Sequence, residues 1–102
     1  PKVTQQMDRL SALVDLIYIH VDMDVLAPEE VRGHSLTAPN GPTSHELAAC
    51  IELMFTWPKT AAIGIASTPY GPRDPEHLSR RAAIRLIDGA VRGAKKREIP
   101  RD

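Results

Sequence analysis

The sequence predicts an α/β fold with a parallel sheet. Two short apolar stretches have the length and residue types of buried strands, and three longer stretches repeat their apolar residues at helical spacing. They follow one another as helix, strand, loop, helix, strand and helix, an order typical of parallel strands joined by right-handed crossovers. Because two strands make a poor sheet alone, we expect the 102 residues to form the end of a larger α/β domain.

The first helix and the first strand are separated by a change of period. Residues 3–13 place an apolar side chain every three or four positions, which predicts an amphipathic helix. Residues 16–21 are then almost continuously apolar and partly β-branched, which favours a strand covered on both faces. The strand ends at Asp22 and Asp24. Residues 25–42 follow as a loop, since proline and glycine interrupt them too often for regular structure.

The second half of the chain contains clear helix signals. Residues 43–46, Thr-Ser-His-Glu, have the pattern of a capping box and start a helix that is expected to end at Trp57. Residues 60–67 form the second predicted strand, whose small side chains permit close helix packing. A third helix is expected from residue 74 to about residue 92, because Asp74 suits the N-cap and a proline follows it. Residues 95–102 are interpreted as a charged tail.

Composition excludes several classes of partner. Lysine and arginine together number 13, as do aspartate and glutamate, so the formal net charge is +0. Such a balance favours neither nucleic acid nor an anionic membrane as a partner. No apolar run approaches the roughly 18 residues of a membrane helix. Cys50 is the only cysteine, which excludes an internal disulfide and fits a reducing, cytoplasmic setting.

The residues with the clearest chemical meaning are Asp22 and Asp24, two positions apart at the end of the first strand. In extended backbone, side chains at this spacing point to the same side. Paired carboxylates repel each other unless a cation lies between them or one is protonated, and hard divalent ions prefer such oxygen ligands. Open α/β folds also place their sites at the carboxyl ends of parallel strands. A plainer reading remains open, in which Asp22 caps the loop and Asp24 is solvated.

These aspartates lie in a motif that resembles a known family. Residues 18–28, Tyr-Ile-His-Val-Asp-Met-Asp-Val-Leu-Ala-Pro, resemble the D-x-D-x-L-D-P signature of the ureohydrolases, the superfamily of arginase, agmatinase and formimidoylglutamase. Residues 40–47 resemble the G-G-L-T-x-R-E-L helix start of that family. Residues 63–69 and 78–91 resemble its next strand and its last helix. The likeness extends over most of the chain, from about residue 16 to residue 91.

The resemblance implies a fold, a metal centre and an activity. Residues 1–102 would be the C-terminal segment of a single arginase-like domain, a three-layer α/β/α fold. The complete protein would be a manganese-dependent hydrolase of non-peptide C–N bonds, with two Mn²⁺ ions per site. Asp22 matches the ligand that bridges both ions and Asp24 a ligand of one ion. The family's N-terminal metal motifs, G-G-D-H and D-x-H-x-D, do not occur in this chain. The resemblance also implies a homo-oligomer, and a chain inactive without the N-terminal part of the domain.

Two departures from the family pattern bear on the substrate. Ala27 replaces the aspartate of L-D-P, a residue that is not a metal ligand. Arginases and agmatinases have a glutamate after the next strand that grips the guanidinium group, whereas residues 66–68 here are Ala-Ser-Thr. The predicted substrate class is therefore a guanidino, amidino or formimino compound, and the missing glutamate speaks against arginine and agmatine. Glu30, or an acid from outside the chain, is the competing source of that carboxylate.

The remaining candidates have weaker signals. His34 in the long loop, and Ser67 and Thr68 after the second strand, are candidate substrate contacts. His20 is in phase with Asp22 and is expected to support the site without binding metal. Cys50 is expected to pack in the core. The alternative function is a non-catalytic arginase-like homologue or structural fragment, which the missing glutamate favours and the retained aspartate pair opposes.

Overall fold

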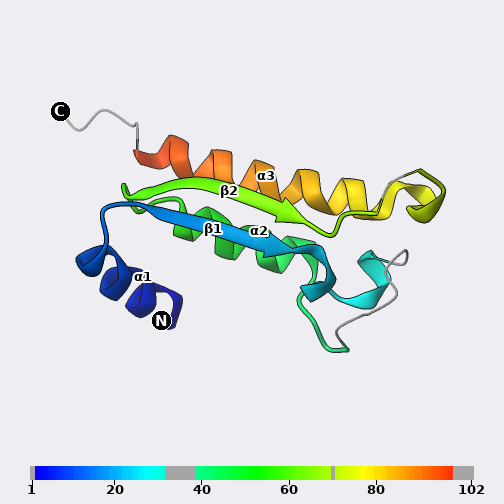
Figure 1. Cartoon of the computed structure of the whole chain (residues 1–102), viewed down its shortest axis with the longest axis horizontal. Helices are drawn as coiled ribbons and strands as arrows, with labels where there is room; N and C mark the ends of the chain where they lie inside the picture. The colour runs from blue at the N-terminus through cyan, green and yellow to red at the C-terminus, as the bar shows by residue number, and fades with distance from the viewer. Residues whose placement is uncertain (1, 32–38, 70, 98–102) are drawn as a thin grey trace.

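The computed structural model describes residues 2–31, 39–69 and 71–97, and its element order is the predicted one (Figure 1). No helix in this part of the chain has the length and apolar character needed to cross a membrane. The connections between these elements contain short 3-10 turns, at Met23–Val25, Pro28–Glu30, Gly71–Arg73 and Pro75–His77. The helices and strands are α1 (Lys2–Leu13), β1 (Ile17–Asp22), α2 (Ser44–Met54), β2 (Thr60–Ala66) and α3 (Leu78–Arg97).

The sheet confirms the predicted parallel pairing. β1 and β2 run parallel, and α2 connects them. Ile19 lies opposite Ile63 and Val21 opposite Ile65, so apolar side chains of both strands share one face. At the carboxyl end of the sheet, Asp22 lies opposite Ala66. The loops that follow both strands therefore leave the sheet at the same edge.

Helices α2 and α3 pack against each other and cover one face of the sheet (Figure 1). Their buried residues Ile51, Phe55 and Leu86 form one core with Val21 of β1. The opposite face carries alternate residues of β1, and Tyr18 there is 60% exposed. The expectation that this strand is covered on both faces is therefore wrong for the described residues. They form two layers of the three-layer α/β/α fold, a sheet and the helices on one face.

The end of α2 and the start of α3 differ from the predictions. α2 ends at Met54, before Trp57, with Phe55 as its C-cap. α3 begins at Leu78, because Glu76 and His77 have φ of 57° and interrupt the helix. Asp74 still caps it: its buried carboxylate accepts hydrogen bonds from the backbone N–H groups of Ser79, at 2.7 Å, and Arg80, at 3.1 Å.

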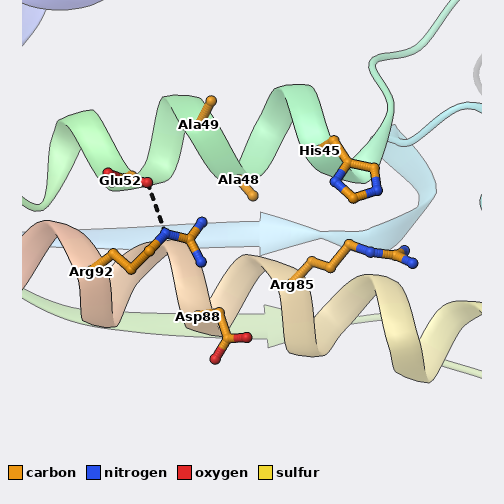
Figure 2. Close-up of a pocket in the computed structure, with 7 residues that line it drawn as sticks. All are labelled: His45, Ala48, Ala49, Glu52, Arg85, Asp88 and Arg92. Atoms are coloured by element: carbon orange, nitrogen blue, oxygen red, sulfur yellow. Dashed lines mark hydrogen bonds and ion pairs between the residues drawn. The ribbon is translucent and has the colours of Figure 1, made fainter.

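The first residues of the predicted charged tail, 95–97, belong to α3, which continues to Arg97, and residues 98–102 lie outside the described residues. Glu52 of α2 pairs with Arg92 at 2.9 Å (Figure 2) and with Lys96 at 2.7 Å, and these cations hold the pKa of Glu52 below its usual range. Arg97 donates to the carbonyl oxygens of Trp57, at 2.8 Å, and Thr60, at 2.9 Å. Basic residues also suit the negative end of a helix dipole. Partners on α2 and at the start of β2 thus extend the helix.

Close contact between α2 and α3 depends on two glycines of α3. A Cβ atom on Gly89 would lie 2.6 Å from the carbonyl oxygen of Ala48, and one on Gly93 would collide with the carbonyl oxygen of Glu52. Both glycines are buried, and they lie one helical turn apart. Their missing side chains therefore let the backbones of the two helices approach each other directly.

We predict that Gly89→Ala destabilises the protein, although alanine is the better helix former by about 1 kcal/mol. Overpacking against a backbone carbonyl costs roughly 1–3 kcal/mol, so a net loss of about 1–2 kcal/mol is expected in urea unfolding. Asp88→Ala is the matched control, because this neighbour is exposed and should change the unfolding free energy by less than about 0.5 kcal/mol. A Gly89→Ala protein as stable as the native chain would contradict the close contact.

Candidate metal centre

Asp22 ends β1 and begins the turn that carries Asp24. Its carboxylate accepts a long hydrogen bond, 3.4 Å, from the backbone N–H of Asp24, and it is the N-cap of the 3-10 turn Met23–Val25. Met23 between them is fully buried and anchors the turn in the core. Asp22 is exposed and Asp24 half-buried. The capping role of Asp22 is thus real, and it leaves carboxylate oxygens facing away from the core.

Ser67, the first residue after β2, lies beside Asp22. Its side chain hydrogen-bonds to the Asp22 carboxylate, and this bond is the main reason why the pKa of Asp22 lies below its usual range. Desolvation opposes the shift, whereas hydrogen bonds with Asp24 and the charge of His20 add to it. Ser67 has a φ of 60°, an uncommon backbone conformation for a serine. Sequence reasoning named Ser67 as a substrate contact and did not foresee its bond to Asp22, which the parallel register of the strands implies.

The other residues predicted from the sequence do not form one cluster with the two aspartates. His20 lies on the open face of the sheet, with Nδ1 3.4 Å from the hydroxyl of Tyr18. That phenol occupies the space over Gly64, where any Cβ atom would collide with it. Thr68 is half-buried next to Ser67. His34 lies outside the described residues.

Glu30 and Cys50 have roles that the sequence left open. The carboxylate of Glu30 accepts hydrogen bonds from the N–H and hydroxyl groups of Ser44, at the start of α2. It is therefore already engaged, which speaks against its use as a guanidinium ligand. Cys50 is half-buried and borders a shallow depression with Gly41 and Leu47, so it is not part of the central core.

The carboxylates of Asp22 and Asp24 are the type of ligand that a hard divalent cation prefers, but two residues are too few to complete its coordination shell. Mn²⁺ prefers about six oxygen or nitrogen donors in octahedral geometry. Within residues 2–31, 39–69 and 71–97, no group of three or more His, Cys, Asp or Glu side chains is placed to hold a metal ion. These two aspartates can supply part of a ligand set, at an edge of the sheet where the end of β1 and the residue after β2 meet.

The order of helices and strands, with paired aspartates at the carboxyl end of a parallel strand, places the chain among the α/β proteins, a class whose sites commonly lie at that end of the sheet. The sequence model of the arginase family matches residues 1–89, and the chain belongs to that family. No curated protein matches the chain at a significant level.

Solved structures of the family superpose on the chain. Formimidoylglutamase from Bacillus subtilis subsp. subtilis str. 168 matches 97% of the chain with a TM-score of 0.87 and 26% sequence identity. Arginase from the same strain matches 87% with a TM-score of 0.74 and 19% identity, and agmatine ureohydrolase of Thermoplasma volcanium 92% with 0.57 and 19%. The last two matches show the fold alone. The chain spans 31%, 30% and 32% of the lengths of these three proteins, respectively.

We predict that Ser67→Ala raises the pKa of Asp22 toward its ordinary value, because the hydroxyl stabilises the charged carboxylate. A carboxyl ¹³C titration of the chain by NMR measures this, with Thr68→Val as the control that removes a neighbouring hydroxyl. A folded pKa below the unfolded value gives stability that is present above the unfolded pKa and is lost as pH falls through the folded pKa. The native chain should therefore lose this contribution at lower pH, and the Ser67→Ala chain should lack part of it. Equal Asp22 pKa values in the two proteins would contradict the assigned bond.

Proposed function

We propose that this chain is the C-terminal part of a manganese-dependent hydrolase of the arginase family that cleaves a C–N bond of a small molecule. The observation that carries the proposal is the Asp22–Asp24 pair, which follows a parallel strand in a chain of the arginase family. The chain has about a third of the length of formimidoylglutamase, so the other metal ligands would come from an N-terminal part of the same domain. The proposal extends to a homo-oligomeric, cytoplasmic protein, as the family resemblance and the lone cysteine suggest.

As the family resemblance implies, Asp22 and Asp24 would hold the manganese, Asp22 as a ligand of both ions and Asp24 as a ligand of one. When bound, such ions would supply an activated water and stabilisation of negative charge on the substrate. Within this chain, the hydrogen bond from Ser67 favours the charged form of the Asp22 carboxylate, because it lowers the pKa of that group. The buried Met23 anchors the turn between the two aspartates, whose side chains lie within hydrogen-bonding reach of each other.

A formimino-type substrate suits the described residues better than a guanidino one. The segment at the end of β2, Ala66-Ser67-Thr68, offers no acid to a guanidinium group, and Glu30 is engaged with Ser44. A buried guanidinium without a carboxylate partner loses paired, charge-assisted hydrogen bonds. The hydroxyl oxygens of Ser67 and Thr68 can instead accept hydrogen bonds from the N–H groups of a formimino substrate, and His34 is proposed as a further contact. The fold match to formimidoylglutamase, at 26% identity, supports this choice.

The first prediction concerns metal binding by the 102-residue chain. We expect weak Mn²⁺ binding and no turnover, because the chain carries too few ligands for a complete site. Mn²⁺ should broaden the NMR signals of residues near Asp22 and Asp24, and Asp22→Asn should reduce this broadening more than Asp24→Asn. Asp8→Asn is the control, because Asp8 lies on α1, outside the turn that carries Asp22 and Asp24. Its carboxylate accepts a hydrogen bond from the indole N–H of Trp57 at 3.0 Å. Tight stoichiometric binding by the chain alone would contradict the view that other ligands lie elsewhere.

The second prediction concerns the substrate of the manganese-loaded full-length protein. We expect formamide release from an N-formimino amino acid to exceed urea release from arginine or agmatine by up to roughly 10⁴-fold, since the site lacks the carboxylate partner of guanidinium. Product assays on the three compounds measure this. Efficient urea release would show that an acid outside residues 66–68 grips guanidinium. A metal-loaded protein that hydrolyses none of them would favour the non-catalytic alternative.

A further inference from the structure

The turn that carries Asp24 is tied to both helices through one carboxylate, that of Glu30. Glu30 ends the short 3-10 turn Pro28–Glu30, a few residues after Asp24. One oxygen of its carboxylate accepts the backbone N–H of Ser44, the first residue of α2, and the other accepts the Ser44 hydroxyl. A carboxylate at the positive end of a helix dipole, bonded to a free N–H group, is favourably placed.

Arg85 of α3 completes this cluster. Its guanidinium donates to the Ser44 hydroxyl oxygen at 3.1 Å and lies 3.8 Å from the nearer oxygen of Glu30. Figure 2 shows Arg85 reaching along the groove between the helices toward the start of α2, near His45. Ser44 is fully buried, and the side chain of Glu30 is only 20% exposed. Hydrogen bonds to charged groups are stronger than neutral ones when water is partly excluded.

The segment between Asp24 and Glu30 has little freedom to move independently of these anchors. Leu26 is fully buried, and the N–H of Ala27 donates to the carbonyl oxygen of Pro42 at 2.8 Å. The N–H of Glu30 donates to the carbonyl oxygen of Ala27 at 2.9 Å. Backbone hydrogen bonds and buried side chains therefore connect the Glu30 carboxylate to the turn with the two aspartates.

We propose that Glu30 is a positioning residue that, through Ser44 and Arg85, holds the Asp22–Asp24 turn against α2 and α3. This inference rests on the proposed function for its consequence, the placing of two metal ligands. Glu30 touches neither aspartate, and its effect passes through the turn. Residues that orient metal ligands from a distance typically change metal affinity by roughly 10–100-fold when they are replaced.

Backbone hydrogen exchange tests the anchor without any metal. Glu30→Gln keeps the size of the side chain but turns an NH₂ group toward a donor of Ser44. We expect the amides of Leu26, Ala27 and Glu30 to exchange about tenfold faster or more, the effect of one lost buried hydrogen bond. The amide of Leu86, in the core of α3, should exchange as in the native chain. Glu29→Gln is the matched control, because the same change is made at an exposed neighbour.

Manganese affinity of the folded chain, followed by NMR broadening near Asp22, tests the consequence. Glu30→Gln should weaken it by roughly tenfold or more, and Glu29→Gln should not change it. Arg85→Lys keeps the positive charge and should also weaken manganese binding, but by less. It replaces Glu30→Gln as the test variant if the Glu30→Gln chain does not fold.

The outcomes separate this inference from the proposed function. Unchanged exchange in the turn overturns the inference, and so does faster exchange throughout α3, which would mark a general loss of stability. Faster exchange confined to the turn, together with an unchanged manganese affinity, also overturns the inference. If the native chain shows no manganese effect near Asp22, the proposed metal site fails, and turn-confined exchange still decides whether Glu30 holds the turn.

Discussion

The parallel pairing of β1 with β2 is the constraint on which the rest of the structure depends. A parallel pair needs a crossover, which α2 provides, and it brings the carboxyl ends of both strands to one edge. Asp22 and Ser67 come together for this reason, although more than forty residues separate them in the chain. The same pairing turns Ile19, Val21, Ile63 and Ile65 toward one face, where α2 and α3 cover them.

Burial and charge are divided cleanly along β1. Alternate residues point into the core, while Tyr18, His20 and Asp22 lie on the other face, exposed in the described residues. The solved structures of the family to which the chain is similar are about three times as long and have the same fold in this region.

The surroundings of Asp22 and Glu30 show how the same chemical group, a carboxylate, serves two purposes. Both carboxylates accept backbone N–H groups at the start of a helical turn, from Asp24 and from Ser44. Asp22 is exposed, whereas Glu30 is enclosed by a buried serine and paired with an arginine. The first is thus available to a ligand from solvent, and the second is committed to holding the chain in place.

The fold and the position of the two aspartates at the end of β1 could be predicted because they depend on local patterns. The helical and strand periods, the capping box at Thr43 and the D-x-D motif at Asp22 are all read from neighbouring residues, and the structure has each element in the predicted order. The ends of α2 and α3 could not be predicted in this way. Asp74 reaches past a kink to cap α3, and Glu52 extends that helix from α2.

The sequence by itself determined the α/β class, the parallel sheet and the position of the aspartate pair, because hydrophobic period and short motifs act over a few residues. Only the tertiary structure decided which side chains meet across long separations. It brought Ser67 to Asp22 through the strand register, and it joined Glu30 to Ser44 and Arg85 through helix packing. Such contacts depend on where whole elements lie relative to one another, and that arrangement is set by the shared core.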